Sequence, residues 1–188
     1  TPRQVSSAAS DVYKRQTTAA KRGYLSANRL EEAILSMTTL NNTAASVMMD
    51  NNIVSATDVT GFGLLGHLGN MLKASSITNQ KNLGAKLFYS KIPLFDGVES
   101  LLNKGLCPSG TERNLKTAAP LTTFSADISH NYQLLLADAQ TSGGLLMSVP
   151  KVRLKTLLTD LKKNSVVPCA VIGQVIQSNE PAQIQVES

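Results

Sequence analysis

The chain has 188 residues, of which 42% are hydrophobic and 16% charged, with a formal net charge of +5 and no tryptophan. That length allows one substantial aliphatic core, and the uncharged apolar runs fall well short of the ~20 residues of a membrane span. Apart from Lys14–Arg15, the basic pairs are Lys21–Arg22 and Lys162–Lys163, and neither is interleaved with aromatic residues. We therefore expect no nucleic-acid partner, and without a span no membrane partner.

Residues 1–16 differ in character from the rest of the chain. They are mostly small and polar, and they follow neither a helical nor a strand period. The stretch from Val5 to Gln16 also resembles a translated sequencing-adaptor remnant. We predict that residues 1–16 are foreign to the fold or form a disordered N-terminal arm, and that residues 17–188 form the domain.

The first half of the domain is predicted to contain two amphipathic helices separated by a short strand. Apolar residues from Leu30 to Met48 keep the three-and-four spacing of one helical face, and Asn51–Asn52 ends that helix. A strand over residues 53–56 follows, and the second helix runs to about Ala74. Residues 75–83 are expected to form a polar loop.

Shorter elements are predicted for the second half. The pattern indicates a strand over 85–89, a short helix over 96–103, a surface loop over 106–114 and a helix over 129–137. It continues with a strand over 145–149, a helix over 151–164 and strands over 166–175 and 184–186. Helices that alternate with single strands and strand pairs indicate an α/β (α+β) fold with a mixed β-sheet covered by helices.

The junction between the first strand and the second helix carries the strongest functional signal. Residues 56–68 read Ala-Thr-Asp-Val-Thr-Gly-Phe-Gly-Leu-Leu-Gly-His-Leu, with Asp58, Thr60, Gly61 and Gly63 at the change from strand to helix. Helix-start N–H groups favour an anion, glycines let the backbone approach a ligand, and aspartate supplies the hard oxygen that Mg²⁺ prefers. The spacing fits a phosphate-and-metal site. It fits equally well a strand–turn–helix in which Asp58 or Thr60 is the N-cap.

A second polar junction precedes the strand predicted over 145–149. Residues 138–144 read Asp-Ala-Gln-Thr-Ser-Gly-Gly, and each polar side chain could instead satisfy local backbone groups, as in many turns. Two such junctions in one chain are harder to explain by turns alone. His67 and His130 are widely separated and no base neighbours Ser142, so we expect no nucleophilic serine.

The two cysteines indicate a compartment rather than a site. Cys107 and Cys169 are far apart in sequence and lack the short-spaced partners of a zinc site. Two thiols fit a reducing compartment, so the expected location is the cytoplasm.

With both junctions in view, the chain resembles the C-terminal domain of selenophosphate synthetase (selenide, water dikinase). The resemblance covers residues 17–178 and is carried by five segments: Ser-Met-Thr-Thr-Leu-Asn at 36–41, the first junction at 56–68, Gly-Thr-Glu-Arg-Asn at 110–114, residues 134–146, and Ala-Val-Ile-Gly at 170–173. Sister families, including aminoimidazole ribonucleotide synthetase and hydrogenase-maturation proteins, share the broader fold but lack this combination. The resemblance implies a fold like the C-terminal domain of aminoimidazole ribonucleotide synthetase.

The resemblance also implies an enzyme that makes selenophosphate from selenide, ATP and water and releases AMP and orthophosphate. In the family, Mg²⁺ ions hold the triphosphate; Asp58 matches the metal-binding aspartate of this half, and Thr60 and Gly61 would shape the pocket. The other metal aspartates, a glycine-rich loop, a lysine and a reactive cysteine or selenocysteine belong to an N-terminal half. We therefore expect no catalytic residue in this chain, no activity of the chain alone, and a homodimer at full length.

Three features depart from the family pattern. Residues 1–16 stand in place of a glycine-rich connection, Ala139 stands where proline is usual, and Ser109 replaces a customary glycine. Two other functions stay open: an interaction module that pairs through a sheet edge or helical face, and a sister-family synthetase acting on a purine intermediate. Residues 140–144 favour the selenium family over that synthetase.

Overall fold

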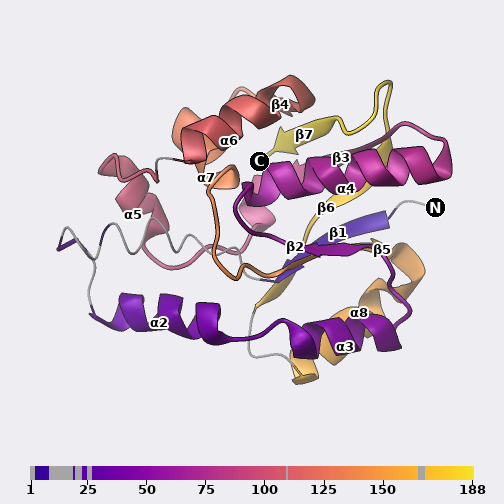
Figure 1. The fold of residues 1–188 in the computed structure, drawn as a ribbon, viewed down its shortest axis with the longest axis horizontal. Helices are drawn as coiled ribbons and strands as arrows, with labels where there is room; N and C mark the ends of the chain where they lie inside the picture. The colour runs from indigo at the N-terminus through magenta and orange to yellow at the C-terminus, as the bar shows by residue number, and fades with distance from the viewer. Residues whose placement is uncertain (1–2, 9–18, 20–22, 25–26, 109, 165–167) are drawn as a thin grey trace.

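The computed structural model describes residues 3–8, 19, 23–24, 27–108, 110–164 and 168–188, and Figure 1 shows their arrangement. The helices and strands in chain order are β1 (Arg3–Ala8), α2 (Ala27–Thr38), α3 (Asn42–Asp50), β2 (Ala56–Asp58), α4 (Gly63–Asn79), β3 (Leu83–Phe88), α5 (Val98–Asn103), α6 (Thr111–Ala118), β4 (Thr122–Phe124), α7 (His130–Leu136), β5 (Leu145–Pro150), α8 (Lys151–Asn164), β6 (Cys169–Gln177) and β7 (Ile184–Glu187). Among these described residues, no helix is both long and apolar enough to cross a membrane.

The strands form one sheet in the order β2-β5-β1-β6-β3-β7-β4. Neighbours from β2 to β3 in this order are antiparallel, whereas β7 is parallel to both β3 and β4. The mixed sheet predicted from the sequence is therefore confirmed. Because β2 and β5 are paired at one edge, the two polar junctions of the sequence lie side by side.

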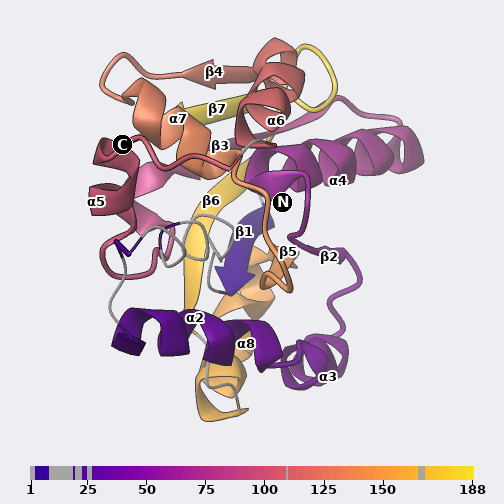
Figure 2. The same ribbon diagram turned by 60° about the vertical axis from the view of Figure 1, so that its left-hand side comes forward.

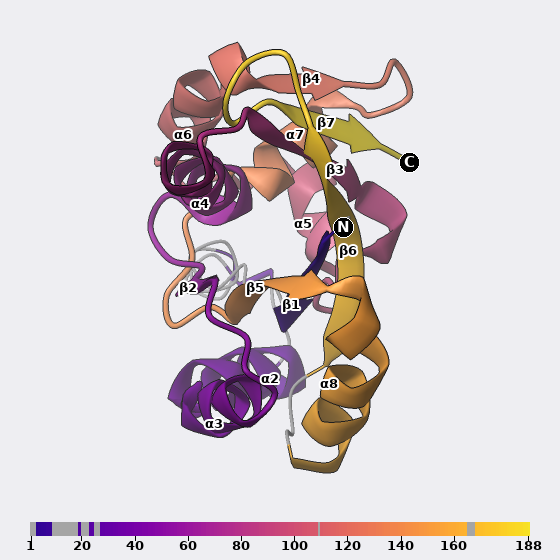
Figure 3. The same ribbon diagram turned by 90° about the vertical axis from the view of Figure 1, so that its right-hand side faces the viewer.

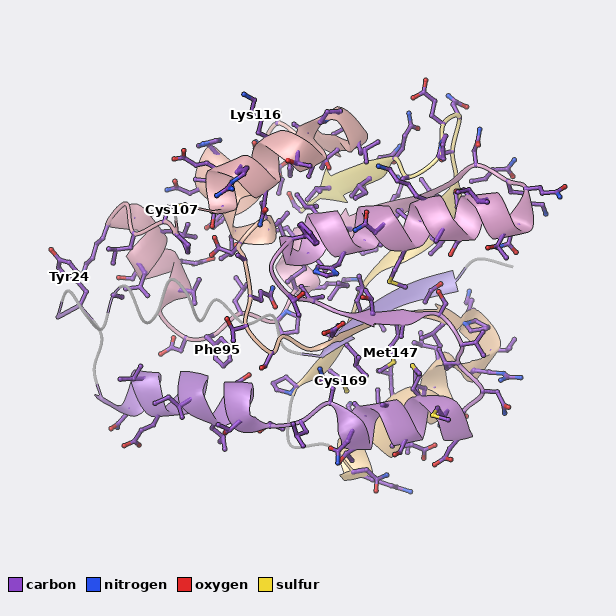
Figure 4. All side chains as sticks on the ribbon, viewed as in Figure 1. Tyr24, Phe95, Cys107, Lys116, Met147 and Cys169 are labelled. Atoms are coloured by element: carbon purple, nitrogen blue, oxygen red, sulfur yellow. The ribbon has the colours of Figure 1, made fainter. Side chains whose placement is uncertain are left out.

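Helices pack on both faces of this sheet, as the alternation of side chains along β5 shows. Leu146 is buried in the core that α4 closes, whereas its neighbour Met147 is buried with Val47 of α3 and Leu157 of α8. Successive side chains of a strand point to opposite faces, so both cores share one strand. Figure 3 shows α4 and α6 toward one end of the molecule and α3 and α8 toward the other. Figure 4 shows Met147 and Cys169 close to α3.

The single helix predicted from Leu30 to Met48 is two helices, α2 and α3. Thr38 and Thr39 direct their hydroxyls onto carbonyls of the preceding turn, at 2.9 Å and 2.7 Å, and such residues are weak helix formers. After the break, Asn41 hydrogen-bonds elsewhere in the fold. The apolar spacing resumes beyond it, so periodicity alone could not reveal the interruption.

Two further boundaries differ from the sequence predictions. α4 continues to Asn79, through the segment expected to be a polar loop, and ends where Gln80 takes a left-handed conformation with φ 50°. The loop expected over 106–114 gives way at Thr111 to α6. The strand predicted over 53–56 shares only Ala56 with β2, and residues 166–167 of the strand predicted over 166–175 lie outside the described residues. The other predicted helices and strands are confirmed within a few residues of their ends. The short edge strand β4 was not predicted.

The first residues differ from the expected disordered arm. Residues 3–8 form β1, which pairs with β5 on one side and β6 on the other, as Figure 2 shows. A strand between two neighbours satisfies its backbone N–H and C=O groups whatever its side-chain pattern, which is why periodicity did not indicate it. Residues 1–2 and 9–16 lie outside the described residues, and a foreign origin of residues 1–16 stays a prediction.

Candidate functional site

Asp58 is the last residue of β2 and lies where the two polar junctions meet. It is paired with Leu145, which directly follows the Gly143–Gly144 pair. One residue on, the Val59 N–H donates a hydrogen bond to the Gly144 carbonyl at 3.0 Å. The two junctions therefore form one local structure, and Asp58 is exposed at its surface.

The turn after Asp58 is held through its backbone. The Thr60 carbonyl accepts hydrogen bonds from the N–H groups of Gly63 and Gln140, both at 3.0 Å. α4 begins at Gly63 with Phe62 in the N-cap position, and no side chain caps the helix start. The alternative in which Asp58 or Thr60 is the N-cap is therefore wrong. The Asp58 carboxylate is not used to begin the helix.

Glycines allow the two junctions to approach each other. A Cβ on Gly63 would lie 2.6 Å from the carbonyl carbon of Ala137 and 2.7 Å from its oxygen. A Cβ on Gly143 would collide with the Val59 carbonyl oxygen. Gly61 is different, because a Cβ there would meet nothing within 4 Å and none of the described residues accepts a hydrogen bond from its N–H. The Gly61 N–H can thus donate to a ligand that approaches the turn.

His67 reaches back from α4 to the same turn. Its Nε2 atom lies 3.0 Å from the backbone nitrogen of Thr60 and 3.2 Å from the Thr60 hydroxyl oxygen. The imidazole also lies beside the Phe62 ring, with 5.7 Å between the ring centroids. Burial lowers the pKa of His67 below its ordinary value of 6.5, and the negative charge of Asp58 partly opposes this shift. His67 is therefore held neutral.

The lowered pKa of His67 predicts a loss of stability at acid pH. As the pH falls below the ordinary value of 6.5, the unfolded chain takes up a proton that the folded chain resists until its lower pKa is reached. The free energy of unfolding should therefore decrease across that window, which denaturant titrations between about pH 8 and about pH 5 would measure. His67→Gln should remove this component of the pH dependence, and His130→Gln should keep it. Identical profiles for wild type and His67→Gln would contradict the prediction.

Two asparagines from other segments tie the junctions together. The Asn114 side-chain amide, from α6, donates to the Gly61 carbonyl at 2.8 Å and to the Ala137 carbonyl at 3.0 Å. The Asn41 amide, from the break between α2 and α3, donates to the Gly143 carbonyl at 2.9 Å. Four of the five segments that carried the family resemblance are thus joined by direct hydrogen bonds.

A buried pair anchors α6 to the second junction. The Thr111 hydroxyl donates to Asp138 Oδ1 at 2.7 Å, and the two residues are 0% and 1% exposed. A buried carboxylate depends on such donors, because leaving a buried polar group without its partner is costly.

We expect Thr111→Val to lower the free energy of unfolding by about 1–3 kcal/mol, because it removes a donor from the buried Asp138 carboxylate. Thr117→Val is the matched control, since Thr117 is an exposed residue of the same helix whose hydroxyl bonds only the local Arg113 carbonyl. The control should change stability by no more than about 0.5 kcal/mol. Equal denaturation midpoints for the two variants would show that the buried pair contributes nothing measurable.

The residues present fit one ligand position of a metal site rather than a complete site. Asp58 offers an exposed carboxylate at the end of a strand, which is a suitable oxygen for Mg²⁺. Across the part of the chain that the structure describes, no group of three or more His, Cys, Asp or Glu residues could hold a metal ion. The two thiols are also separate: Figure 4 shows Cys107 in the segment between α5 and α6, and Cys169, at the start of β6, near α3.

A cavity of about 630 Å³ lies between α4 and the sheet. Its lining runs from Ser55 and Leu68 to Gln177 and includes Lys81 at the far end of α4. None of Asp58, Thr60 and Gly61 lines it, so we place the candidate site at the exposed junction instead.

Sequence reasoning found Asp58, Thr60 and Gly61 and missed the residues that hold them. The sequence alone predicts no role in the site for His67, Asn41, Thr111 or Asn114. Asn41, Thr111 and Asn114 are not separated from the junctions by any regular helical or strand spacing. Only their place in the segments of the family resemblance could have indicated them. The role of Asp58 in metal binding and the roles of Thr60 and Gly61 in nucleotide binding stay predictions.

The chain was compared with known families. The family described as AIR synthase related protein, C-terminal domain, matches residues 5–184. The chain is 38% identical over 164 residues to a selenide, water dikinase of Carboxydothermus hydrogenoformans, covering 87% of this chain and 45% of that protein. It is 39% identical over 167 residues to a selenide, water dikinase of Myxococcus xanthus, covering 88% of this chain and 45% of that protein. The chain thus spans about 45% of the length of these curated relatives.

Solved structures agree on the fold. The hydrogenase maturation protein HypE of E. coli has a TM-score of 0.67 at 13% identity, covering 99% of this chain and 46% of that one. A hydrogenase maturation protein HypE in complex with ATP has a TM-score of 0.61 at 17% identity, covering 95% of this chain and 43% of that one. With the family match spanning nearly all of the sequence, the chain belongs to the family of AIR synthase related proteins, as their C-terminal domain.

Proposed function

We propose that this chain is the C-terminal part of a selenide, water dikinase, which makes selenophosphate from selenide, ATP and water and releases AMP and orthophosphate. The observation that carries the proposal is the identity of 38% over 87% of the chain to a protein of that name. The joining of Asp58, Gly61 and the second junction into one exposed site supports it, since these are the segments of the family resemblance.

Asp58 is proposed as one ligand of a Mg²⁺ ion that holds the triphosphate of ATP. The support is chemical: its carboxylate is exposed, does not cap α4, and ends a strand whose pairing fixes its backbone. Bound Mg²⁺ would neutralise phosphate charge during transfer. One carboxylate does not make a metal site, so the remaining ligands are assigned to ATP, water and an N-terminal half of the enzyme.

Gly61 and Thr60 are proposed to shape the nucleotide side of this site. None of the described residues accepts a hydrogen bond from the Gly61 N–H, and a Cβ at this position would meet nothing within 4 Å, so a phosphate oxygen could approach this N–H. Thr60 has its N–H, hydroxyl and carbonyl engaged by His67, Gly63 and Gln140, so its contribution is to the shape of the turn. A neighbour in fold is described in complex with ATP, which agrees with ATP as the substrate.

The isolated chain is proposed to be inactive, and the full-length enzyme to be a cytoplasmic homodimer. To test the function, the chain would be joined to the N-terminal half of the Carboxydothermus hydrogenoformans relative. AMP release would be measured with and without selenide, and selenophosphate followed by ³¹P NMR. We expect selenide-dependent AMP and selenophosphate from this chimera and neither product from the chain alone. AMP formed by the isolated chain, or independent of selenide in an active chimera, would contradict the proposal.

A further inference from the structure

We propose that His67 is a positioning residue for this site: as the neutral tautomer protonated on Nδ1, it fixes the Thr60 peptide and thereby the direction in which Asp58 presents its carboxylate. The inference rests on the proposed function, in which Asp58 binds Mg²⁺. It concerns the backbone between β2 and α4 rather than contact with a substrate.

The tautomer follows from the hydrogen bond to the backbone. A peptide N–H can only donate, and the Thr60 nitrogen lies 3.0 Å from His67 Nε2. Nε2 must therefore present its lone pair, which places the ring proton on Nδ1. The Thr60 hydroxyl, 3.2 Å from the same Nε2, can interact with it only as a donor.

The hydrogen bond from the Thr60 N–H to His67 differs in origin from most other contacts of residues 58–60. Asp58 is paired with Leu145, Val59 donates to Gly144, and the Thr60 carbonyl accepts from Gln140. All three partners belong to the second junction and its strand. At the start of α4 the Gly63 N–H also donates to the Thr60 carbonyl, and His67 adds a second restraint from that helix, on the Thr60 N–H.

The position of the His67 imidazole is fixed by its place on α4 and by the neighbouring Phe62 ring. His67 is half-buried on α4, in the turn that also contains the buried Leu64 and Leu68. Its ring is in contact range of Phe62, the residue at the N-cap position of that helix. Removing a residue that hydrogen-bonds to a metal ligand typically lowers metal affinity or activity by about 10–100-fold. His67 would act on Asp58 through the Thr60 peptide, so this range is the upper limit of its expected effect.

The structural half of the proposal can be tested on the 188-residue chain without metal. In ¹⁵N-labelled protein, the imidazole spectrum of His67 should show the Nδ1–H tautomer. A scalar coupling should connect the Thr60 amide nitrogen with His67 Nε2 across the hydrogen bond. An Nε2–H tautomer, or a freely exchanging Thr60 amide, would overturn the proposal whatever the enzyme does.

The functional half uses two variants in the chimera described above. His67→Gln retains a carbonyl acceptor at a similar reach, whereas His67→Phe keeps a ring and loses the acceptor. We expect His67→Phe to raise the KM for Mg-ATP, by at most about 10–100-fold, and His67→Gln to recover most of that loss. Equal KM values for His67→Phe and wild type would overturn the positioning role.

Asp58→Asn, measured in parallel, separates the two proposals. If Asp58→Asn abolishes turnover while His67→Phe behaves as wild type, only the role of His67 fails. If Asp58→Asn leaves turnover unchanged, the metal site itself fails. Denaturation midpoints of both His67 variants distinguish a change in KM from a loss of folded protein.

Discussion

Replacing Asp58 by Asn in the chimera should lower Mg-ATP-dependent turnover by at least about 100-fold, because removing even an outer partner of a metal ligand costs about 10–100-fold. The substitution keeps the size of the side chain and removes the negative charge. An amide oxygen is a weaker ligand for Mg²⁺ than a carboxylate, so the loss should be partly relieved by raising the Mg²⁺ concentration. Initial rates of AMP formation as a function of Mg²⁺ would measure both effects.

Folding should be unaffected by this change. Asp58 is exposed and does not cap α4, so Asp58→Asn should shift the free energy of unfolding by no more than about 0.5 kcal/mol. Asp127→Asn is the matched control, since it neutralises another exposed carboxylate at a distance in sequence from both junctions. Near-normal turnover of Asp58→Asn would remove Asp58 from the site. A similar loss in both variants would indicate a general charge effect.

The part of the site that the sequence predicts well is the part made by consecutive residues. Asp58, Thr60 and Gly61 lie within one strand–turn–helix, whose helix is indicated by apolar periodicity and whose strand was predicted two to three residues too early. The pairing of β2 with β5 could not be derived from periodicity. Two polar junctions suggested a shared site, but only the sheet order places Leu145 opposite Asp58.

Side-chain hydrogen bonds between distant segments account for most of what was missed. Asn41 holds the break between α2 and α3 through a bond to Gly143, yet the apolar pattern continues across that break. Thr111 begins α6 with its side chain buried against Asp138, whereas neighbouring Pro108 and Gly110 are typical of a surface loop. Such contacts have no sequence period, because each depends on the tertiary position of a single carbonyl or carboxylate.

The tight contact between the junctions gives the largest expected effect on stability. Gly63→Ala should lower the free energy of unfolding by about 3 kcal/mol or more, from two causes. Gly63 has φ +70°, a conformation that costs an L-residue about 1–2 kcal/mol. The new Cβ would also lie 2.6–2.9 Å from backbone atoms of Ala137 and Asp138, which cannot rotate away as a flexible side chain could.

Two other glycines of the chain separate these causes. Gly105 has φ +68° with nothing within 4 Å of a new Cβ, so Gly105→Ala should show the conformational cost alone. Gly61 has neither a positive φ nor a close neighbour, so Gly61→Ala should leave stability within about 1 kcal/mol of wild type. In denaturant titrations, the free energy of unfolding should therefore be lowest for Gly63→Ala, intermediate for Gly105→Ala and highest for Gly61→Ala. If Gly63→Ala and Gly105→Ala are equally stable, the approach of α4 to the end of α7 is looser than these distances require, and the two junctions are then held together by their hydrogen bonds alone.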